Sequence, residues 1–156
     1  MIYFYTFTKR TAVFAEVLGR LVDMPLYKLE SELDGKSAFG FIFAALVLTF
    51  RRKTSPILNM PTDPISKDIY VCSPIWGGRV SAPARYFLEN ANLTNTRVHL
   101  LLTASIPHVK YRDRAEEYLR TLSCQVGKVM IFATSDKTMP EEDVLLEHIR
   151  EALEDE

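Results

Sequence analysis

Strand-like and helix-like segments alternate along the whole of this sequence, and this alternation restricts its fold more than any other feature. Five short apolar runs predict strands at 2–6, 25–30, 68–72, 98–103 and 126–133. A segment with apolar residues at helical spacing follows each run, at about 11–22, 38–50, 82–90, 111–123 and 141–153. Because β-α-β connections are almost always right-handed, these repeats predict a five-stranded parallel sheet with helices on both faces. We expect one α/β domain over residues 1–156, a three-layer sandwich with strand order 2-1-3-4-5.

The apolar positions in these helices predict which side chains face the core. The expected positions are Val13, Phe14, Val17, Leu18 and Leu21 in the first helix, Ala115, Tyr118, Leu119 and Leu122 in the fourth, and Val144, Leu145, Ile149 and Leu153 in the last. Residues 54–67 are rich in proline and polar side chains, so they predict a surface excursion, and residues 73–81 predict a loop.

The most hydrophobic segment, 38–50, predicts a helix that is apolar on every side. It is shorter than the roughly 18 apolar residues that a membrane-spanning helix needs, so we expect no membrane span. Such a helix suits deep burial, a pocket wall or a homodimer interface through 38–50. The cations of 51–53 that follow it suit a solvated helix C-terminus, with binding to a membrane surface as the alternative. The N-terminal residues lack the pattern of a signal peptide, so a cytoplasmic location is expected.

Charge and cysteine content argue against several classes of function. The chain has 19 Lys and Arg against 20 Asp and Glu, without the broad basic surface that nucleic acid binding needs. Its 2 cysteines, Cys72 and Cys124, lack the spacing of metal ligands, so we expect buried free thiols. No pair of histidines has metal-ligand spacing either, and no metal site is expected.

In open α/β sheets, ligands bind beyond the carboxyl ends of the strands, where the strand order reverses. The first loop there, 6–11, brings hydroxyl groups, cations and N–H groups to a helix N-terminus, which suits a phosphate. The alternative is that Thr8 only caps the helix and Thr6 only ends the strand. The second loop, 73–79, places Trp76 beside two glycines, where a planar ring can stack. The third loop, 103–108, offers hydroxyl and N–H groups to the polar edge of the same ring.

These three loops together resemble those of the flavodoxin family. Thr6-Phe7-Thr8-Lys9-Arg10-Thr11 is similar to the family's phosphate loop, T/S-x-T-G-x-T, with Lys9 in the place of the glycine. Ser73-Pro74-Ile75-Trp76-Gly77-Gly78 is similar to the G-x-P-x-W/Y-x-G loop over the flavin, and Thr103-Ala104-Ser105 to the T-S-G loop. The resemblance implies a flavodoxin-like fold that binds FMN noncovalently. It implies that Thr6, Thr8, Lys9, Arg10 and Thr11 surround the phosphate, that Trp76 lies against the isoalloxazine, and that Thr103 to Ser105 lie near its pyrimidine side.

The resemblance further implies electron or hydride transfer by bound FMN. Because the formal net charge is only -1, the chain lacks the acidic field of flavodoxin electron carriers, which favours an FMN-dependent NAD(P)H or quinone-type oxidoreductase. Its partner would be a redox protein or a small-molecule electron acceptor. The alternative is a flavodoxin-fold interaction module that has lost FMN and acts through dimer or partner binding. His108, beside the third loop, is the candidate proton donor. His99 lies within an apolar strand, so we expect it to be a buried structural residue, and we expect His148, on the last helix, to lie on the surface.

Overall fold

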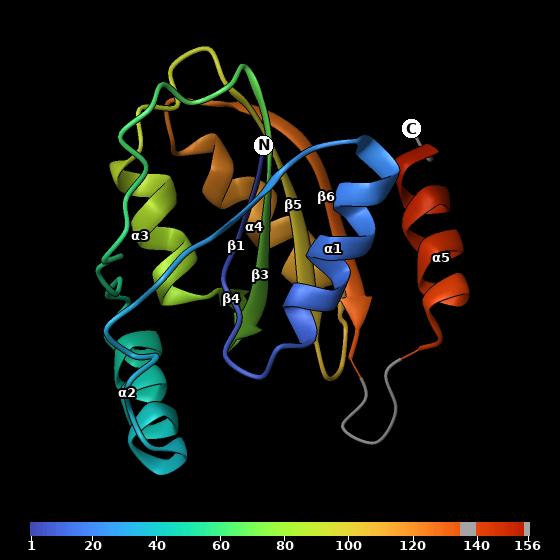
Figure 1. Ribbon diagram of the computed structural model, residues 1–156. Helices are drawn as coiled ribbons and strands as arrows, with labels where there is room; N and C mark the ends of the chain where they lie inside the picture. The colour runs from blue at the N-terminus through green and yellow to red at the C-terminus, as the bar shows by residue number, and fades with distance from the viewer. Residues whose placement is uncertain (135–139, 155–156) are drawn as a thin grey trace.

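The computed structural model describes residues 1–134 and 140–154 of the chain. Its elements are β1 (Ile2–Phe4), α1 (Arg10–Val22), β2 (Leu26–Lys28), α2 (Ala38–Phe50), β3 (Asp68–Trp76), β4 (Arg79–Val80), α3 (Ala82–Asn90), β5 (Arg97–Ala104), α4 (Val109–Arg120), β6 (Gln125–Ala133) and α5 (Glu142–Glu154). Helices α1 and α5 cover one face of the sheet, and α3 and α4 cover the other (Figure 1). This arrangement confirms the three-layer α/β sandwich.

The sheet contains five parallel strands in the order β2-β1-β3-β5-β6. Among the parallel strands alone this is the predicted order 2-1-3-4-5. The structure adds β4, which pairs antiparallel with the end of β3 through Ile75↔Val80 and Trp76↔Arg79. The prediction of a loop over 73–81 is therefore wrong, because β3 continues to Trp76 and turns back on itself. The first two strands are shorter than predicted, since β1 ends at Phe4 and β2 spans only Leu26–Lys28.

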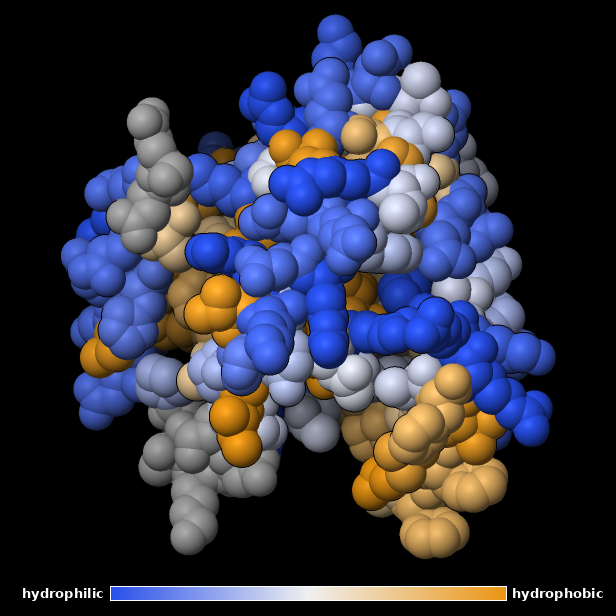
Figure 2. Space-filling model, turned by 180° about the vertical axis from the view of Figure 1, so that it is seen from behind, coloured by the Kyte–Doolittle hydropathy of each residue, from blue (hydrophilic) through white to orange (hydrophobic). Residues whose placement is uncertain are grey.

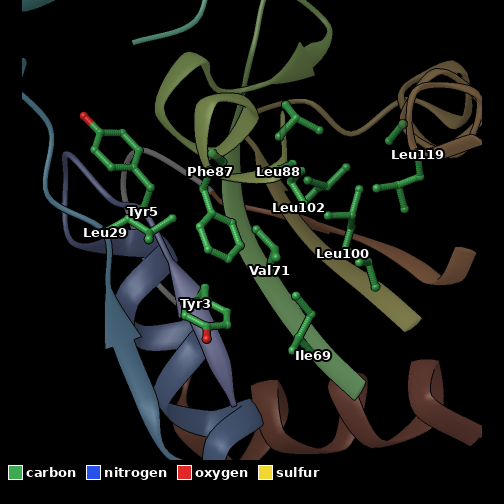
Figure 3. Close-up of a cluster of buried hydrophobic side chains, with 14 of the residues drawn as sticks. Tyr3, Tyr5, Leu29, Ile69, Val71, Phe87, Leu88, Leu100, Leu102 and Leu119 are labelled. Carbon is green, nitrogen blue, oxygen red and sulfur yellow. The ribbon is translucent and has the colours of Figure 1, made fainter. Parts of the chain in front are cut away.

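Two hydrophobic cores lie on opposite faces of this sheet. The core beneath α3 and α4 is shown in Figure 3, where Phe87 points toward Val71 and lies near Tyr3. The rings of Tyr3 and Phe87 have their centroids 4.5 Å apart. The core beneath α1 and α5 contains Phe14, Leu18, Leu145 and Ile149, together with Cys72. Because β3 is central and contributes to both cores, its side chains are apolar on both faces, as in other buried parallel strands.

The burial of two helix residues and of part of the segment 54–67 differs from the prediction. Val13 and Val144 were predicted to face the core but are exposed, because the buried stripes centre on Phe14 and Leu145, one residue and about 100° further round each helix. The excursion 54–67 does not lie wholly on the surface. Ile57 joins the core, and the buried Ser55 hydroxyl lies 2.9 Å from that of Ser31.

The two cysteines are free, as expected, but they differ in burial. Cys72 is fully buried in β3, and burial raises the pKa of its thiol far above the usual range. Cys124 is only partly buried, and its thiol donates to the Leu119 carbonyl at 3.6 Å. Burial raises the Cys124 pKa as well, so neither thiol is activated as a nucleophile.

His99 stabilises an irregularity between β5 and β6. The register shifts between Val98 and Leu100, so that β6 carries an extra residue opposite His99. The His99 Nδ1 accepts the Lys128 backbone N–H at 3.0 Å, and its Nε2 lies 2.8 Å from Asp68 Oδ1. Since Nδ1 is an acceptor, Nε2 carries the proton and donates to Asp68. This confirms the expected structural role of His99 and explains it.

We expect the stability of the fold to fall between pH 7.5 and pH 5.5 because of His99. Burial lowers the His99 pKa, and Arg97 and Lys128 act in the same direction, while Asp68 opposes them in part. Histidine in the unfolded chain has a pKa of about 6.5, so below that pH the unfolded state binds more protons and stability is lost. Urea unfolding across this range should show a falling midpoint that His99→Gln makes flatter. An equally steep fall in that variant would contradict the assignment.

Helix α2 lies outside both helical layers, at the carboxyl end of the sheet (Figure 1). One side of it packs against the molecule through Phe41 and Ala45, in a small cluster with Leu33. Its other side is exposed and forms a hydrophobic surface, visible at the lower right of Figure 2. Deep burial, one of the expected roles for 38–50, is thus excluded within a single copy. None of the helices in the described parts of the chain is long and apolar enough to cross a membrane.

Candidate functional site

The loops after β1, β3 and β5 meet at the carboxyl edge of the sheet, because these three strands are neighbours. The hydroxyl oxygens of Thr11 and Thr103 lie 2.9 Å apart, which joins the first loop to the third. Phe7 and Trp76 both contact Phe41, which joins the first loop to the second. The structure thus brings together the three segments that the sequence singled out.

The loop 6–11 combines an unsatisfied buried hydroxyl with an uncapped helix. Thr6 is 9% exposed, and its Oγ1 has no hydrogen-bond partner among the described residues. The N-cap of α1 is Lys9 rather than Thr8, and no side chain caps the helix. The Ala12 N–H donates to the Lys9 carbonyl at 3.1 Å. In general the N-terminal turn of a helix has N–H groups to offer, so the start of α1 suits an anionic ligand. The first turn also holds no acidic residue, which leaves the positive end of the helix dipole uncompensated.

Lys9 adopts the backbone conformation that glycine usually supplies. Its φ is 64°, in the left-handed region. The backbone of the loop can therefore keep the left-handed conformation at this position, although lysine stands where the flavodoxin pattern has glycine. The left-handed region costs a residue with a Cβ about 1–2 kcal/mol.

Lys9→Gly should therefore stabilise the fold by up to about 1 kcal/mol, since the greater flexibility of glycine in the unfolded chain offsets part of the relief. Thermal unfolding of the two proteins measures this difference. A matched Lys28→Gly variant, in a strand, should instead lose stability. A Lys9→Gly variant less stable than the parent would show that the lysine side chain itself supports the loop.

The second loop is a tight hairpin between β3 and β4. Gly77 and Gly78 have φ of 55° and 76°, as a two-residue turn with both central residues left-handed requires. Ser73 is fully buried, and its hydroxyl donates to the Pro74 carbonyl at 2.9 Å and lies 2.8 Å from that of Ser81. Ser73 therefore braces the hairpin, while Trp76, Gly77 and the partly exposed Ile75 form its surface.

Trp76 stands at the tip of this hairpin and is partly exposed. Its ring meets the rings of Tyr5 and Phe41 edge-on, with centroid distances of 5.8 and 5.3 Å. Trp76 and Gly77 form one wall of a cavity of about 550 Å³, and Phe41, Ile42, Ala45, Leu46, Thr49 and Phe50 of α2 form the other. This size and apolar lining suit a planar organic ligand.

The third loop, 103–108, begins with small side chains that lie next to the first loop, 6–11. Thr103 is buried and bound to Thr11, and Ala104 is also buried, whereas Ser105 is exposed. His108 is the N-cap of α4, and its Nδ1 accepts the Lys110 N–H at 3.1 Å. It lines a different cavity, with Lys128 and Phe132. The structure therefore gives His108 a capping role and does not bring it to Trp76, while His148 is exposed, as expected.

Sequence reasoning missed the aromatic residues that support Trp76. Phe7 stacks on Phe41 with a centroid distance of 3.4 Å and an interplanar angle of 4°. The buried Tyr5 donates its hydroxyl to Asp34 at 3.0 Å. Burial and the Asp34 carboxylate raise the Tyr5 pKa far above its ordinary value, so the phenol stays protonated. Phe7 lies inside the phosphate-loop motif, but Phe41 reaches this site only through the placement of α2, which no local pattern indicates.

Comparisons of the sequence with protein-family models and with curated proteins give no match. Solved structures do match. The chain is similar to a candidate flavoprotein from Bacteroides eggerthii DSM 20697, with a TM-score of 0.76, 16% identity, and coverage of 99% of this chain and 97% of that one. A flavoprotein in complex with FMN from Lactobacillus acidophilus NCFM matches with a TM-score of 0.64, 20% identity, and coverage of 83% and 90%.

The two-electron reduced flavodoxin of Megasphaera elsdenii also matches, with a TM-score of 0.54, 13% identity, and coverage of 94% of this chain and 96% of that one. Together with the strand order, these similarities show that the chain has the flavodoxin-like fold. The resemblance seen in the loops is thus confirmed at the level of the fold.

Proposed function

We propose that this protein binds FMN noncovalently at the carboxyl edge of its sheet and takes part in electron or hydride transfer. The observation that carries the proposal is the buried Thr6 hydroxyl, which lacks a partner among the described residues and lies in the loop that leads into α1. A buried polar group without a partner costs about 1–3 kcal/mol, and a phosphate oxygen in this loop would satisfy it. The FMN complex of the Lactobacillus acidophilus protein, which shares the fold, supports this choice of ligand.

The residues of the loop 6–11 suit the phosphate of FMN. The N–H groups at the start of α1 and the hydroxyls of Thr6 and Thr8 would donate to the phosphate oxygens. Lys9 is exposed, and Arg10 lies at the first position of the helix, so both add positive charge beside the ligand. Thr11 would act mainly by fixing Thr103, to which it is bound.

The residues of the other two loops suit the ring system. Trp76 would lie against the isoalloxazine, because its ring forms one wall of the apolar cavity. Gly77 lets the Thr49 side chain of α2 lie against the hairpin, because a Cβ there would collide with it, whereas Ser73 and Pro74 would hold the hairpin in place. Ala104 and the exposed Ser105 would offer N–H and hydroxyl groups to its pyrimidine side.

Bound FMN supplies electron and hydride transfer, and the protein binds, orients and shields it. No side chain of this chain need exchange a proton with the substrate in such a role. The near-neutral chain and its apolar cavity favour a small-molecule acceptor, such as a quinone, with NAD(P)H as donor. Protein incubated with FMN should therefore oxidise NADH or NADPH when a quinone is present.

Visible absorption after incubation with FMN and desalting tests the binding. Thr6→Val should lower FMN affinity about tenfold or more, because a hydrogen bond to a charged group is lost. The same change should leave the fold at least as stable, since it removes an unsatisfied buried hydroxyl. Thr94→Val, an exposed threonine outside the site, serves as the matched control. Colourless protein that cannot take up FMN would instead favour the alternative, an interaction module without cofactor.

We propose in addition that α2 mediates a homodimer. Phe39, Ile42, Phe43, Leu46 and Phe50 are between 51% and 83% exposed. Four of them, Phe39, Phe43, Leu46 and Phe50, are spaced by four, three and four residues, which is the pattern of a seam that packs against a second helix. With about 200 Å² for each phenylalanine, the exposed stripe offers roughly 500–600 Å² per copy. Two copies would thus approach the lower range of specific interfaces, about 1,200 Å².

Light scattering after size exclusion should give about twice the 17.9 kDa of one chain. Phe43→Glu places a charge in the middle of the exposed stripe, so this variant should be a monomer with an unchanged fold. Val144→Glu changes an exposed valine on α5 and should leave the dimer intact. Wild-type protein with the mass of one chain would refute the dimer.

A further inference from the structure

A second cavity, of about 480 Å³, lies on the side of the sheet covered by α3 and α4. Four arginines line it, Arg52, Arg79, Arg85 and Arg114, and they come from four different parts of the chain. Glu117 is the single carboxylate among the lining residues. Figure 2 shows strongly hydrophilic side chains on this face, directly above the apolar surface of α2. The lining therefore carries an excess of positive charge.

Arg85 is the most constrained of the four. It is only 7% exposed, in α3, and its Nη2 donates to the Lys53 carbonyl at 2.7 Å. Its Nε has no hydrogen-bond partner in the part of the chain that the structure describes, and no carboxylate there forms an ion pair with it. A buried guanidinium without a carboxylate is costly unless something else supplies the negative charge.

The groups around Arg85 do not supply the missing negative charge. Burial lowers the Arg85 pKa, and Arg79 acts in the same direction, while Tyr118 and Glu89 oppose them. Glu89 is exposed and already accepts the Tyr118 hydroxyl at 3.0 Å. The charge of the arginines is thus only partly compensated within the protein.

The hairpin tip leaves room for Arg114 beside this cavity. A Cβ on Gly78 would lie 2.7 Å from Arg114 Nη1 and 3.1 Å from Tyr111 Cε1. Gly78 therefore permits the guanidinium of α4 to lie against the β3–β4 turn. Arg79, one residue further, lines the same cavity.

We propose that Arg79, Arg85 and Arg114, with Arg52 at the rim, form a binding site for a small molecule that carries phosphate groups. Guanidinium groups bind phosphate through paired hydrogen bonds, and several of them can share a di- or polyphosphate. The volume is sufficient for more than an isolated phosphate. Val80, Ala115 and Tyr118 also line the cavity and would contact the less polar part of the ligand.

This site is separate from the loop 6–11 but adjoins the cavity of Trp76. The loop leads into α1, on the opposite face of the sheet from α3 and α4. Arg52 and Arg79 line both the arginine cavity and the apolar cavity that contains Trp76. A phosphate-bearing ligand held here could extend toward the Trp76 ring, as a substrate or electron donor would. The proposal stands without the FMN site, because it rests on the arginines alone.

Calorimetric titration with inorganic pyrophosphate and with ADP tests the proposal on the full chain. Wild-type protein should bind both probes, and Arg114→Gln, a change at an exposed side chain, should weaken binding about tenfold or more. Arg112→Gln is the matched control, since Arg112 is exposed on the same helix but lines a different cavity. If ADP binds more tightly than pyrophosphate, the site recognises nucleotides. If the two probes bind equally, the site recognises the phosphate groups alone.

The same titration in the presence of saturating FMN separates this site from the FMN site. Pyrophosphate should still bind, and Arg114→Gln should leave FMN affinity unchanged. The proposal would be overturned by wild-type protein that binds neither probe, by equal losses in Arg114→Gln and Arg112→Gln, or by complete displacement of pyrophosphate by FMN. If the protein binds pyrophosphate but not FMN, the proposed FMN function is refuted, whereas the proposed phosphate site in the arginine cavity still holds.

Discussion

Gly127→Ala should cost the fold about 2–4 kcal/mol, because the bulge between β5 and β6 leaves no room for a methyl group. A Cβ at this position would lie 2.8 Å from both the Val98 carbonyl oxygen and His99 Nδ1. The carbonyl belongs to a buried strand and cannot move away, and displacement of the His99 ring would weaken its bonds to Lys128 and Asp68. Overpacking of this kind costs about 1–3 kcal/mol, and the lost hydrogen bonds about 1 kcal/mol more.

Thermal unfolding measures this effect, and we expect the midpoint to fall by roughly 4–16 °C for a chain of this size. Gly35→Ala is the matched control, because a Cβ there meets no atom within 4 Å. That variant should be as stable as the parent or slightly more so. If Gly127→Ala unfolded at the same temperature as Gly35→Ala, the close packing of His99 against the bulge would be wrong.

Trp76→Ala should have the largest effect on the proposed FMN site. Stacking of an aromatic ring against a heteroaromatic ligand contributes about 1–3 kcal/mol, so the dissociation constant should rise roughly 5- to 150-fold. The stability of the variant should fall as well, because Trp76 also packs against Tyr5 and Phe41. Flavin fluorescence titration measures the affinity, and urea unfolding measures the stability of the same sample.

Trp76→Phe separates the two effects. Phenylalanine keeps an aromatic face for the ligand, so it should recover most of the FMN affinity and part of the packing against Phe41. Equal FMN affinity in wild type and Trp76→Ala would show that the isoalloxazine does not lie against this ring. The affinity of Thr6→Val would then indicate whether FMN binds at the loop 6–11 by its phosphate alone.

The order of strands and helices could be predicted because it depends on local patterns and on the handedness of connections. The apolar run at 68–72, for example, is long enough to mark a strand buried on both faces, and it became the centre of the sheet. The three loops of the candidate site followed from this topology. They lie together because the carboxyl ends of neighbouring parallel strands share one edge.

The features that the sequence did not predict depend on contacts between distant residues. The extension of β3 to Trp76 required recognition that Gly77 and Gly78 form a two-residue turn, whereas the same glycines also suit an open loop. The partner of Thr11 is Thr103, and no pattern relates those positions. The arginine cavity is the clearest case, since Arg52 and Arg114 become neighbours of one cavity only through the placement of α2 and α4.

Nuclear magnetic resonance of ¹⁵N-labelled protein during addition of FMN tests the proposed cofactor site most directly. We predict that the backbone signals of Thr8, Lys9 and Ser105 and the indole N–H signal of Trp76 shift together, while signals from the amino ends of the strands stay in place. Shifts confined to Arg79, Arg85 and Arg114 would mean that FMN uses only the arginine cavity. An unchanged spectrum at high FMN concentration would contradict the proposed function itself.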